Sequence, residues 1–337
     1  MISAKIVADS INESGNRITT MEVVFPRFIL AELNTHRAFS RNSASSRAIP
    51  FEKMVKSVQE NPFIPIAWQK DHKGMQGTEY FAHPQEVQKC IDRWLYHRDS
   101  AVQSAKELSQ LGITKQLCNR LLEPFMYHKV LITATEFNNF FNLRCPKYSL
   151  FSENIPMEFK SKKELIEFVE KIEAPEFKDS YKDLTDLDWL KCNTGQAEIH
   201  MMTLAEAMYD AINESTPKKL KAGEWHIPYG DDIDVFKLNS ELNHEPLSIP
   251  YTEDQKLWLN EQRIKIATAR CARVSYTVVG EEGKKPNYEN DIKLYDRLLE
   301  SGHYSPFEHV ALCKHDSKNY ANFKGFKQIR TILEENV

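Results

Sequence analysis

Residues 34–47 (NTHRAFSRNSASSR) concentrate the side-chain types that bind phosphate. The stretch holds three arginines, four serines, two asparagines and one histidine, and it contains no acidic residue. Guanidinium groups make bidentate, charge-assisted hydrogen bonds to phosphate oxygens, and small residues let backbone N–H groups approach an anion. The stretch therefore predicts a loop that binds a phosphorylated small molecule. A solvated polar loop is the alternative interpretation.

A second candidate is residues 302–309 (GHYSPFEH), where two histidines and a glutamate surround a Ser-Pro turn. Histidine titrates near neutral pH and can donate or accept a hydrogen bond. The spacing of His303 and His309 on a proline-containing loop does not match a standard set of metal ligands, so we predict no metal site. The alternative is a helix C-cap followed by a structural turn.

Two further stretches combine rings with hydrogen-bonding groups. Residues 138–144 (NNFFNLR) offer amides, two phenylalanines and a terminal arginine, which could line a pocket for a heterocycle. The alternative is a core helix with an exposed Arg144. Residues 222–230 (AGEWHIPYG) could form an aromatic loop over a ligand, but a hydrophobic plug that closes a surface groove is the favoured interpretation.

The overall composition limits the classes of partner. The 337 residues include 44 basic and 48 acidic side chains, so the net charge of −4 gives no general attraction to nucleic acid or to an anionic membrane. The N-terminus lacks the apolar core of a signal peptide, and no run of about 18 apolar residues suggests a membrane span. The six cysteines form no C-x-x-C pair, which is typical of reduced thiols. We therefore expect a cytoplasmic protein, in the host cytoplasm if the chain is viral.

The hydrophobic pattern predicts the elements that would position these stretches. Residues 5–26 read as a β-hairpin around Gly15, followed by a short helix that starts at Pro26 and leads into residues 34–47. Amphipathic or apolar periodicity predicts further helices at residues 83–112, 118–144, 195–215, 257–272 and 290–302. The expected fold class is α/β (α+β), with a mixed sheet and packed helices.

Residues 145–191 differ from the rest, because they are charged and contain three prolines. One helix is indicated there by a capping box of Ser161 and Glu164. We interpret this segment as a peripheral insertion in a single domain that spans residues 1–337.

Together these stretches resemble the flavin-dependent thymidylate synthases, also called thymidylate synthase complementing proteins. That family carries an Arg-His-Arg motif followed, after seven residues, by serine; here Thr35-His36-Arg37 precedes Ser45 with the same spacing. ARVSY (272–276) and GHYSPFEH look like the family's flavin-side segment. NNFFNLR, with GQAEI (195–199) later in the chain, looks like its pyrimidine-side helices.

The sequence departs from the family pattern in several ways. The flavin-side segment lies near the C-terminus, whereas in the family it precedes the Arg-His-Arg motif, so the chain looks circularly permuted. Thr35 replaces the first arginine of the motif, and Thr194 replaces a histidine. Glu32 and Ser43 stand where the family has nucleotide-contacting side chains of other types.

The resemblance implies a role for each matching residue. His36, Arg37, Asn139 and Ser305 would contact FAD, while His303, as a catalytic residue, and Glu308 would shape the flavin and folate side. The nucleotide phosphate and sugar would be held by Ser45, Ser46 and Arg47, with Arg120 as a second phosphate contact. Arg144 would face the uracil ring as both a substrate contact and a catalytic residue.

The implied activity is reductive methylation of dUMP to dTMP with FAD, methylenetetrahydrofolate and NADPH, in a homotetramer. An arginine at the edge of the ring can stabilise negative charge that develops there, and a reduced flavin can deliver hydride. One alternative is C5 hydroxymethylation or another modification of a pyrimidine deoxynucleotide. An alternative of another class is a nucleotide- or RNA-binding protein without catalysis.

Overall fold

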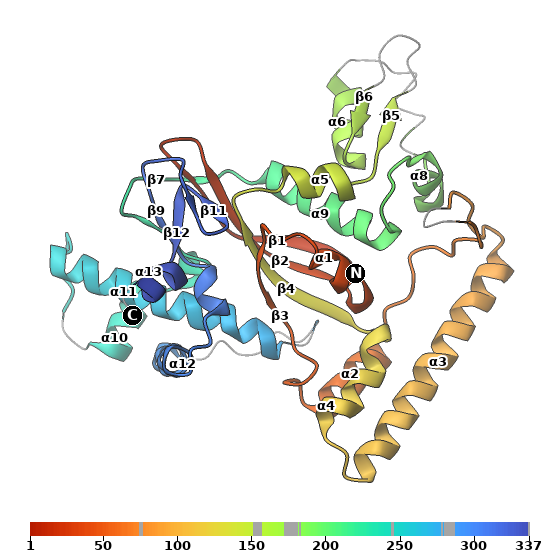
Figure 1. Ribbon diagram of the computed structural model, residues 1–337, viewed down its shortest axis with the longest axis horizontal. Helices are drawn as coiled ribbons and strands as arrows, with labels where there is room; N and C mark the ends of the chain where they lie inside the picture. Colours follow the sequence, from red (N-terminus) through yellow and green to blue (C-terminus); the bar gives the residue numbers. More distant parts are fainter. Residues whose placement is uncertain are drawn as a thin grey trace.

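The computed structural model describes residues 1–73, 77–150, 157–171, 181, 183–243, 246–277, 279 and 287–335. Its centre is a five-stranded sheet in the order β3-β4-β2-β1-β7 (Figure 1). Neighbouring strands are antiparallel except for β1 and β7, which run parallel. The predicted mixed sheet with packed helices is therefore confirmed. The strands are β1 (Ser3–Asn12), β2 (Arg17–Pro26), β3 (Ser40–Ser43), β4 (Tyr127–Ala134) and β7 (Lys218–Leu220).

The predicted N-terminal hairpin is confirmed as β1 and β2. Gly15 takes a φ of 79° at the turn, a backbone conformation that favours glycine, and Asn12 Oδ1 accepts the backbone N–H groups of Ser14 and Asn16. Pro26 is the last residue of β2, so the prediction that it starts the helix was wrong by one residue. The helical turns that follow are η1 (Arg27–Ile29) and α1 (Leu30–Leu33).

The prediction of a mostly helical segment over residues 118–144 was wrong in its middle. Residues 127–134 form β4, which lies between β3 and β2. A strand buried on both faces has a continuous apolar run, which periodicity does not distinguish from a buried helix. Val130 and Ile132 pack on one face, whereas Leu131 packs on the other against Cys271 and Val274. The flanking elements are helical: α4 (Lys115–Cys118), η2 (Asn119–Phe125) and α5 (Asn138–Arg144).

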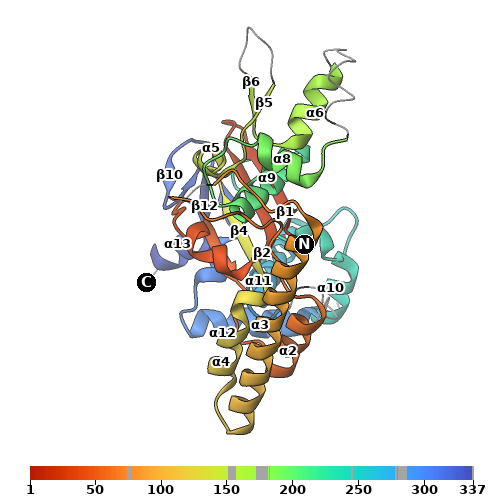
Figure 2. The same ribbon diagram turned by 90° about the vertical axis from the view of Figure 1, so that its right-hand side faces the viewer.

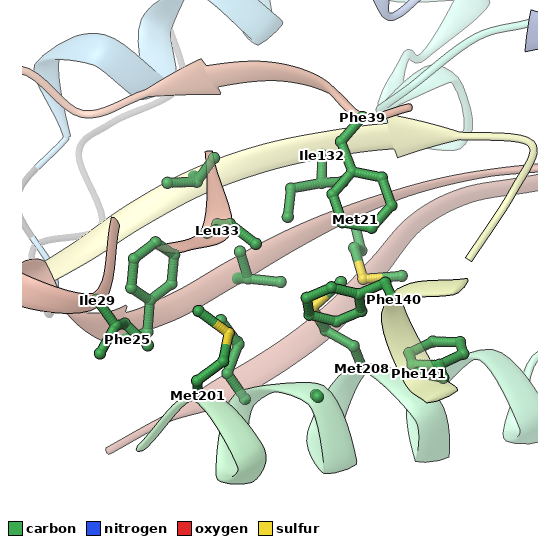
Figure 3. Packing of buried hydrophobic residues seen from close by; sticks show 14 of the residues in the cluster. Met21, Phe25, Ile29, Leu33, Phe39, Ile132, Phe140, Phe141, Met201 and Met208 are labelled. Atoms are coloured by element: carbon green, nitrogen blue, oxygen red, sulfur yellow. The ribbon is translucent and has the colours of Figure 1, made fainter. Parts of the chain in front are cut away.

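Helix α9 (Ile199–Glu214) covers one face of the sheet together with α5. Figure 3 shows Met208 of this packing beside Met21 and Phe140, and Met201 nearer to Phe25, all of them buried. The methionines of α9 therefore act as core residues.

The remaining helices form groups on two sides of the sheet. α2 (Phe51–Glu60) and α3 (Pro84–Gln110) pack with η2, and Figure 2 shows them at the end of the molecule opposite β5, β6 and α6. On the other side lie α10 (Val235–Leu242), α11 (Glu253–Arg273), α12 (Tyr288–Glu300) and α13 (Ile329–Glu335), with a small sheet of β12 (Phe326–Gln328), β9 (Ala311–Cys313) and β8 (Trp225–His226). No helix in the described ranges is both long and apolar enough to cross a membrane.

A projecting unit separates α5 from α9 in the sequence. It comprises β5 (Tyr148–Leu150), β6 (Met157–Phe159), α6 (Lys162–Lys171) and α8 (Asp186–Cys192), and its own hydrophobic cluster includes Phe159, Leu165 and Trp189. Its two chain connections meet, because the N–H of Thr194 donates to the carbonyl of Lys147 at 3.0 Å. The predicted helix with Ser161 at its start is confirmed, whereas residues 151–156, 172–180 and 182 of the predicted insertion lie outside the described residues.

Candidate functional site

Strand β3 places the arginine- and serine-rich stretch against the C-terminal segment that resembles the flavin side. The short helix η5 (Ser305–Glu308) lies on β3, and the buried Asn42 connects the two. Asn42 Nδ2 donates to the carbonyl of Cys271 at 2.5 Å, and its Oδ1 accepts from Ser305 Oγ at 3.4 Å. The backbone N–H of Ser45 donates to the carbonyl of Ser275. Three stretches that are distant in the sequence therefore meet at β3.

The turn between α1 and β3 carries an excess of positive charge. Arg41 Nη1 donates to the carbonyls of Leu33 and His36 at 3.2 and 3.1 Å and so holds this turn closed. Burial lowers the pKa of Arg41; the nearby Glu308 acts against this lowering, and Arg37 adds to it. Glu308 in turn accepts a hydrogen bond from Arg330 at 2.6 Å. Glu308 therefore lies close to Arg41 and is bonded to Arg330, while Arg37 adds a further positive charge near Arg41.

His36 and Arg144 are in direct contact. Arg144 Nε donates to His36 Nε2 at 3.1 Å, and the ring of Phe140 packs edge-on against the imidazole with 4.8 Å between ring centroids. Burial lowers the pKa of His36, and the charges of Arg144 and Arg41 lower it further. His36 is therefore held as a neutral ring.

A carboxylate, Glu32, lies on the other side of Arg144, 3.9 Å from its Nη1. Burial raises the pKa of Glu32, and the nearby Glu198 raises it further. Glu198 itself is engaged, because it accepts the backbone N–H groups of His200 and Met201 at the start of α9 and also pairs with His200 Nδ1 at 2.5 Å. His200 Nε2 accepts the N–H of Ile66 at 3.1 Å, so this histidine is fixed at both ring nitrogens.

Two of the predicted phosphate contacts, Ser46 and Arg120, lie in a separate cluster around Glu123. Ser46 Oγ donates to Glu123 Oε1 at 2.6 Å, and Arg120 and Arg27 lie 3.5 and 3.8 Å from the same oxygen. Arg47 is exposed and donates to Gln116 Oε1 at 3.3 Å. Sequence reasoning missed Glu123 and Arg27. The pairing of Glu123 with Arg120 could have been expected, because the two are three residues apart in a helical stretch, where such side chains are neighbours.

Several of the predicted site residues lie on the surface. Arg37, Asn139 and His303 are exposed, and within the described ranges none of their side chains makes a hydrogen bond or ion pair. His303 follows Gly302, whose φ of 67° ends α12 as the sequence predicted. The structure thus brings His36 and Arg144 into contact and seats Ser305 beside β3. It leaves Asn139 and His303 open to solvent within the single chain.

A buried polar chain, which sequence reasoning also missed, runs beneath η5. Ser10 Oγ and Thr20 Oγ1 lie 2.9 and 2.8 Å from the two ring nitrogens of His226. Thr20 Oγ1 is 2.7 Å from Thr133 Oγ1, which lies 2.8 Å from His309 Nδ1. Burial lowers the pKa of both histidines to about 3. His226 is fully buried, as expected if residues 222–230 form a hydrophobic plug.

The described residues contain no group of three or more His, Cys, Asp or Glu side chains placed to hold a metal ion.

Comparison with known proteins shows only distant similarity. No family model matches the sequence, and no curated protein matches it. Two solved structures of the UMP/dUMP methylase PolB from Streptomyces cacaoi, bound with 5-Br dUMP and 5-Br UMP, show a distant likeness. They are 14% and 15% identical, cover 56% of this chain and 93% and 92% of their own, and have TM-scores of 0.36 and 0.35.

Proposed function

We propose that this protein is a flavin-dependent enzyme that transfers a one-carbon unit to C5 of a pyrimidine deoxynucleoside monophosphate. The acceptor to test first is dUMP, which would give dTMP with methylenetetrahydrofolate as carbon donor and NADPH as reductant. The observation that carries the proposal is the contact between His36 and Arg144 next to the junction of β3 and η5. It joins the stretch that resembles the family's Arg-His-Arg motif to the stretch that resembles its pyrimidine side.

The residues around β3 have the chemistry that FAD needs. Arg37 and His303 are exposed donors, and Arg41 adds a second guanidinium close to Arg37. Such donors suit the pyrophosphate of a dinucleotide, and the Ser305 hydroxyl can hydrogen-bond the cofactor. When bound, the flavin supplies hydride chemistry.

Arg144 has the chemistry needed at the pyrimidine. Its Nε is used by His36, whereas Nη1 and Nη2 make no hydrogen bond within the described ranges, so both can donate to ring atoms. The overall conversion joins the methylene carbon of the folate to C5 and breaks its two bonds to folate nitrogens. The hydride that reduces this carbon to a methyl group originates from NADPH, which becomes NADP+. Tetrahydrofolate leaves, and its two nitrogens take up protons equal to the C5 proton released and one from solvent. A fixed guanidinium stabilises negative charge on the ring during this conversion. No cysteine nucleophile is required, in keeping with the burial of Cys118, Cys145, Cys271 and Cys313.

We further propose a homotetramer in the cytoplasm. The side chains of Arg37, Asn139 and His303 point to solvent within one chain, which supports a site completed by a second copy. The phosphate cluster around Glu123 is distinct from the His36–Arg144 contact, and it would serve the same or a neighbouring site in the assembly.

The test is the visible absorption spectrum of the purified protein with FAD, followed by anaerobic addition of NADPH with and without dUMP. We expect bound flavin that bleaches, with dUMP changing the rate, and a C5-methylated product by mass spectrometry. A hydroxymethylated product would assign the alternative C5 modification. Absence of flavin binding together with a salt-dependent shift on generic RNA would overturn the proposal in favour of an RNA-binding protein.

A further inference from the structure

Glu32 and Arg144 present unused hydrogen-bonding groups side by side. The 3.9 Å between Glu32 Oε2 and Arg144 Nη1 is too long for a hydrogen bond, so neither group satisfies the other. Within the described ranges, the carboxylate of Glu32 accepts no hydrogen bond, and the Nη groups of Arg144 donate none. The two Nη donors of Arg144 and the carboxylate acceptor of Glu32 therefore form one partly exposed hydrogen-bonding edge.

The groups around this edge are already committed. Arg144 Nε is bound to His36, which holds the plane of the guanidinium. Glu198 accepts three hydrogen bonds from His200 and the start of α9, and His200 is held by Ile66 at its other nitrogen. Glu32 is thus the acceptor at this edge that remains free for a ligand.

The order of donors and acceptors can be compared with the edges of the two pyrimidines. The Watson–Crick edge of cytosine reads acceptor, acceptor, donor, from O2 through N3 to the 4-amino group, and that of uracil reads acceptor, donor, acceptor. A guanidinium fork beside a carboxylate satisfies all three groups of cytosine. With uracil, the same pair leaves one carbonyl oxygen without a donor and next to a negative charge, which costs binding free energy.

We infer that this site accepts a 4-aminopyrimidine ring, that of a cytosine deoxynucleotide such as dCMP, and that Glu32 is the residue that distinguishes it from uracil. The inference rests on the proposed function, because it uses Arg144 as the contact to the pyrimidine. It goes beyond that function by naming the ring and the residue that selects it. The partial exposure of both side chains, 39% for Glu32 and 24% for Arg144, leaves the edge accessible.

The experiment is calorimetric titration of dCMP and of dUMP into the FAD-loaded protein, for the wild type, Glu32→Gln and Glu60→Gln. The wild type should bind dCMP at least about tenfold more tightly than dUMP, the ratio expected from one unsatisfied polar group. Glu32→Gln should reduce that ratio about tenfold or more, because an amide can turn to donate to O4 of uracil. Glu60→Gln makes the same change on the exposed side of α2 and should leave the ratio unchanged.

The outcomes separate the two proposals. Preference for dUMP in the wild type, unaffected by Glu32→Gln, would overturn the role of Glu32, while C5 modification of dUMP would leave the proposed function standing. Binding of neither nucleotide to the flavin-loaded protein would overturn both. If Glu32→Gln does not fold by circular dichroism, Glu32→Asp replaces it, and the shorter carboxylate should weaken dCMP more than dUMP.

Discussion

Arg144 and His36 are 108 positions apart in the sequence, yet the Nε–H of Arg144 donates to Nε2 of His36 across 3.1 Å. Arginine can only donate, so His36 accepts at Nε2 and carries its proton on Nδ1. Protonation of Nε2 would place two donors against each other, which agrees with the lowered pKa of His36. The pair therefore fixes both the tautomer of the histidine and the orientation of the guanidinium.

Replacing Arg144 by alanine should abolish turnover while flavin still binds. Removal of one group that stabilises charge in a transition state typically costs about 100-fold or more in rate. Loss of the neighbouring positive charge should also raise the pKa of His36, which NMR titration would detect. Arg93→Ala, an exposed arginine on α3, is the matched control. Product formation close to the wild-type rate in Arg144→Ala would sink the assigned role.

Replacing Arg47 by alanine should weaken nucleotide binding more than flavin binding. A charge-assisted hydrogen bond to a phosphate contributes about 1.5 kcal/mol or more, so nucleotide affinity should fall about tenfold or more. Separate titrations of FAD and nucleotide measure the two effects. Lys56→Ala removes one positive charge from the exposed side of α2 and should change neither. A larger loss of flavin affinity would show that the two ligands have been interchanged.

Acid should destabilise the protein below about pH 6.5. The pKa values of His128, His226 and His309 are each lowered to about 3, mainly by burial. Between pH 3 and 6.5, the pKa of a histidine in the unfolded chain, the unfolded state therefore binds more protons than the folded state. The free energy of unfolding is highest above pH 6.5 and decreases as pH falls toward 3. Each histidine contributes a slope of about 1.4 kcal/mol per pH unit. Urea denaturation at pH 7.5, 6 and 5 measures the combined slope.

His128→Leu tests the origin of that slope. Neither ring nitrogen of His128 has a hydrogen-bond partner among the described residues, and its ring packs edge-on against Phe25 in the core. Replacing it by an apolar side chain should leave stability at pH 7.5 unchanged or raise it by about 1 kcal/mol, and should remove about one third of the acid slope. An unchanged slope would show that His128 does not titrate on unfolding.

The junction of the projecting unit with α9 should weaken as pH rises through neutrality. Burial raises the pKa of Glu206 to about 7, and its Oε1 accepts the backbone N–H of Lys162 at 2.7 Å. A raised carboxyl pKa contributes stability that is fully present below the unfolded value of 4.5 and is lost as pH rises through about 7. Glu206→Gln should abolish the fall in amide-exchange protection at Lys162 between pH 4.5 and 7.5, the range over which the unfolded chain loses this proton before the folded chain does. Glu167→Gln, on the exposed side of α6, should retain it.

Local patterns predicted the elements whose signals lie within a few residues. Gly15 between two alternating runs gave the hairpin, and Gly302 at the end of an amphipathic run gave the end of α12. The central strand β4 was mistaken for a helix, because residues 130–134 are buried whichever element they form. That distinction depends on β2 and β3, which pair with it from distant parts of the sequence.

The residues of the candidate site likewise fall into two groups, those that local sequence patterns predicted and those that they did not. Arginines and histidines with strong side-chain chemistry, such as His36 and Arg144, could be selected from their types and spacing. Thr20, Thr133 and Ser10 could not, because hydroxyl side chains in a strand are common and their role depends on which strand lies beside them. Glu123 lies within residues 118–144, where a helix but no role for this residue was predicted. Its pairing with Ser46 depends on a contact between residues 77 positions apart.

The chain enters and leaves the projecting unit at a single point, where Lys147 bonds with Asn193 and Thr194. The separation between Arg144 and Glu198 therefore does not depend on how many residues lie between them. Residues 148–192 could be lengthened, shortened or exchanged for a brief linker while both ends of the site kept their places. The projecting unit can therefore acquire a new specificity or a new binding partner while the neighbouring site residues keep their positions.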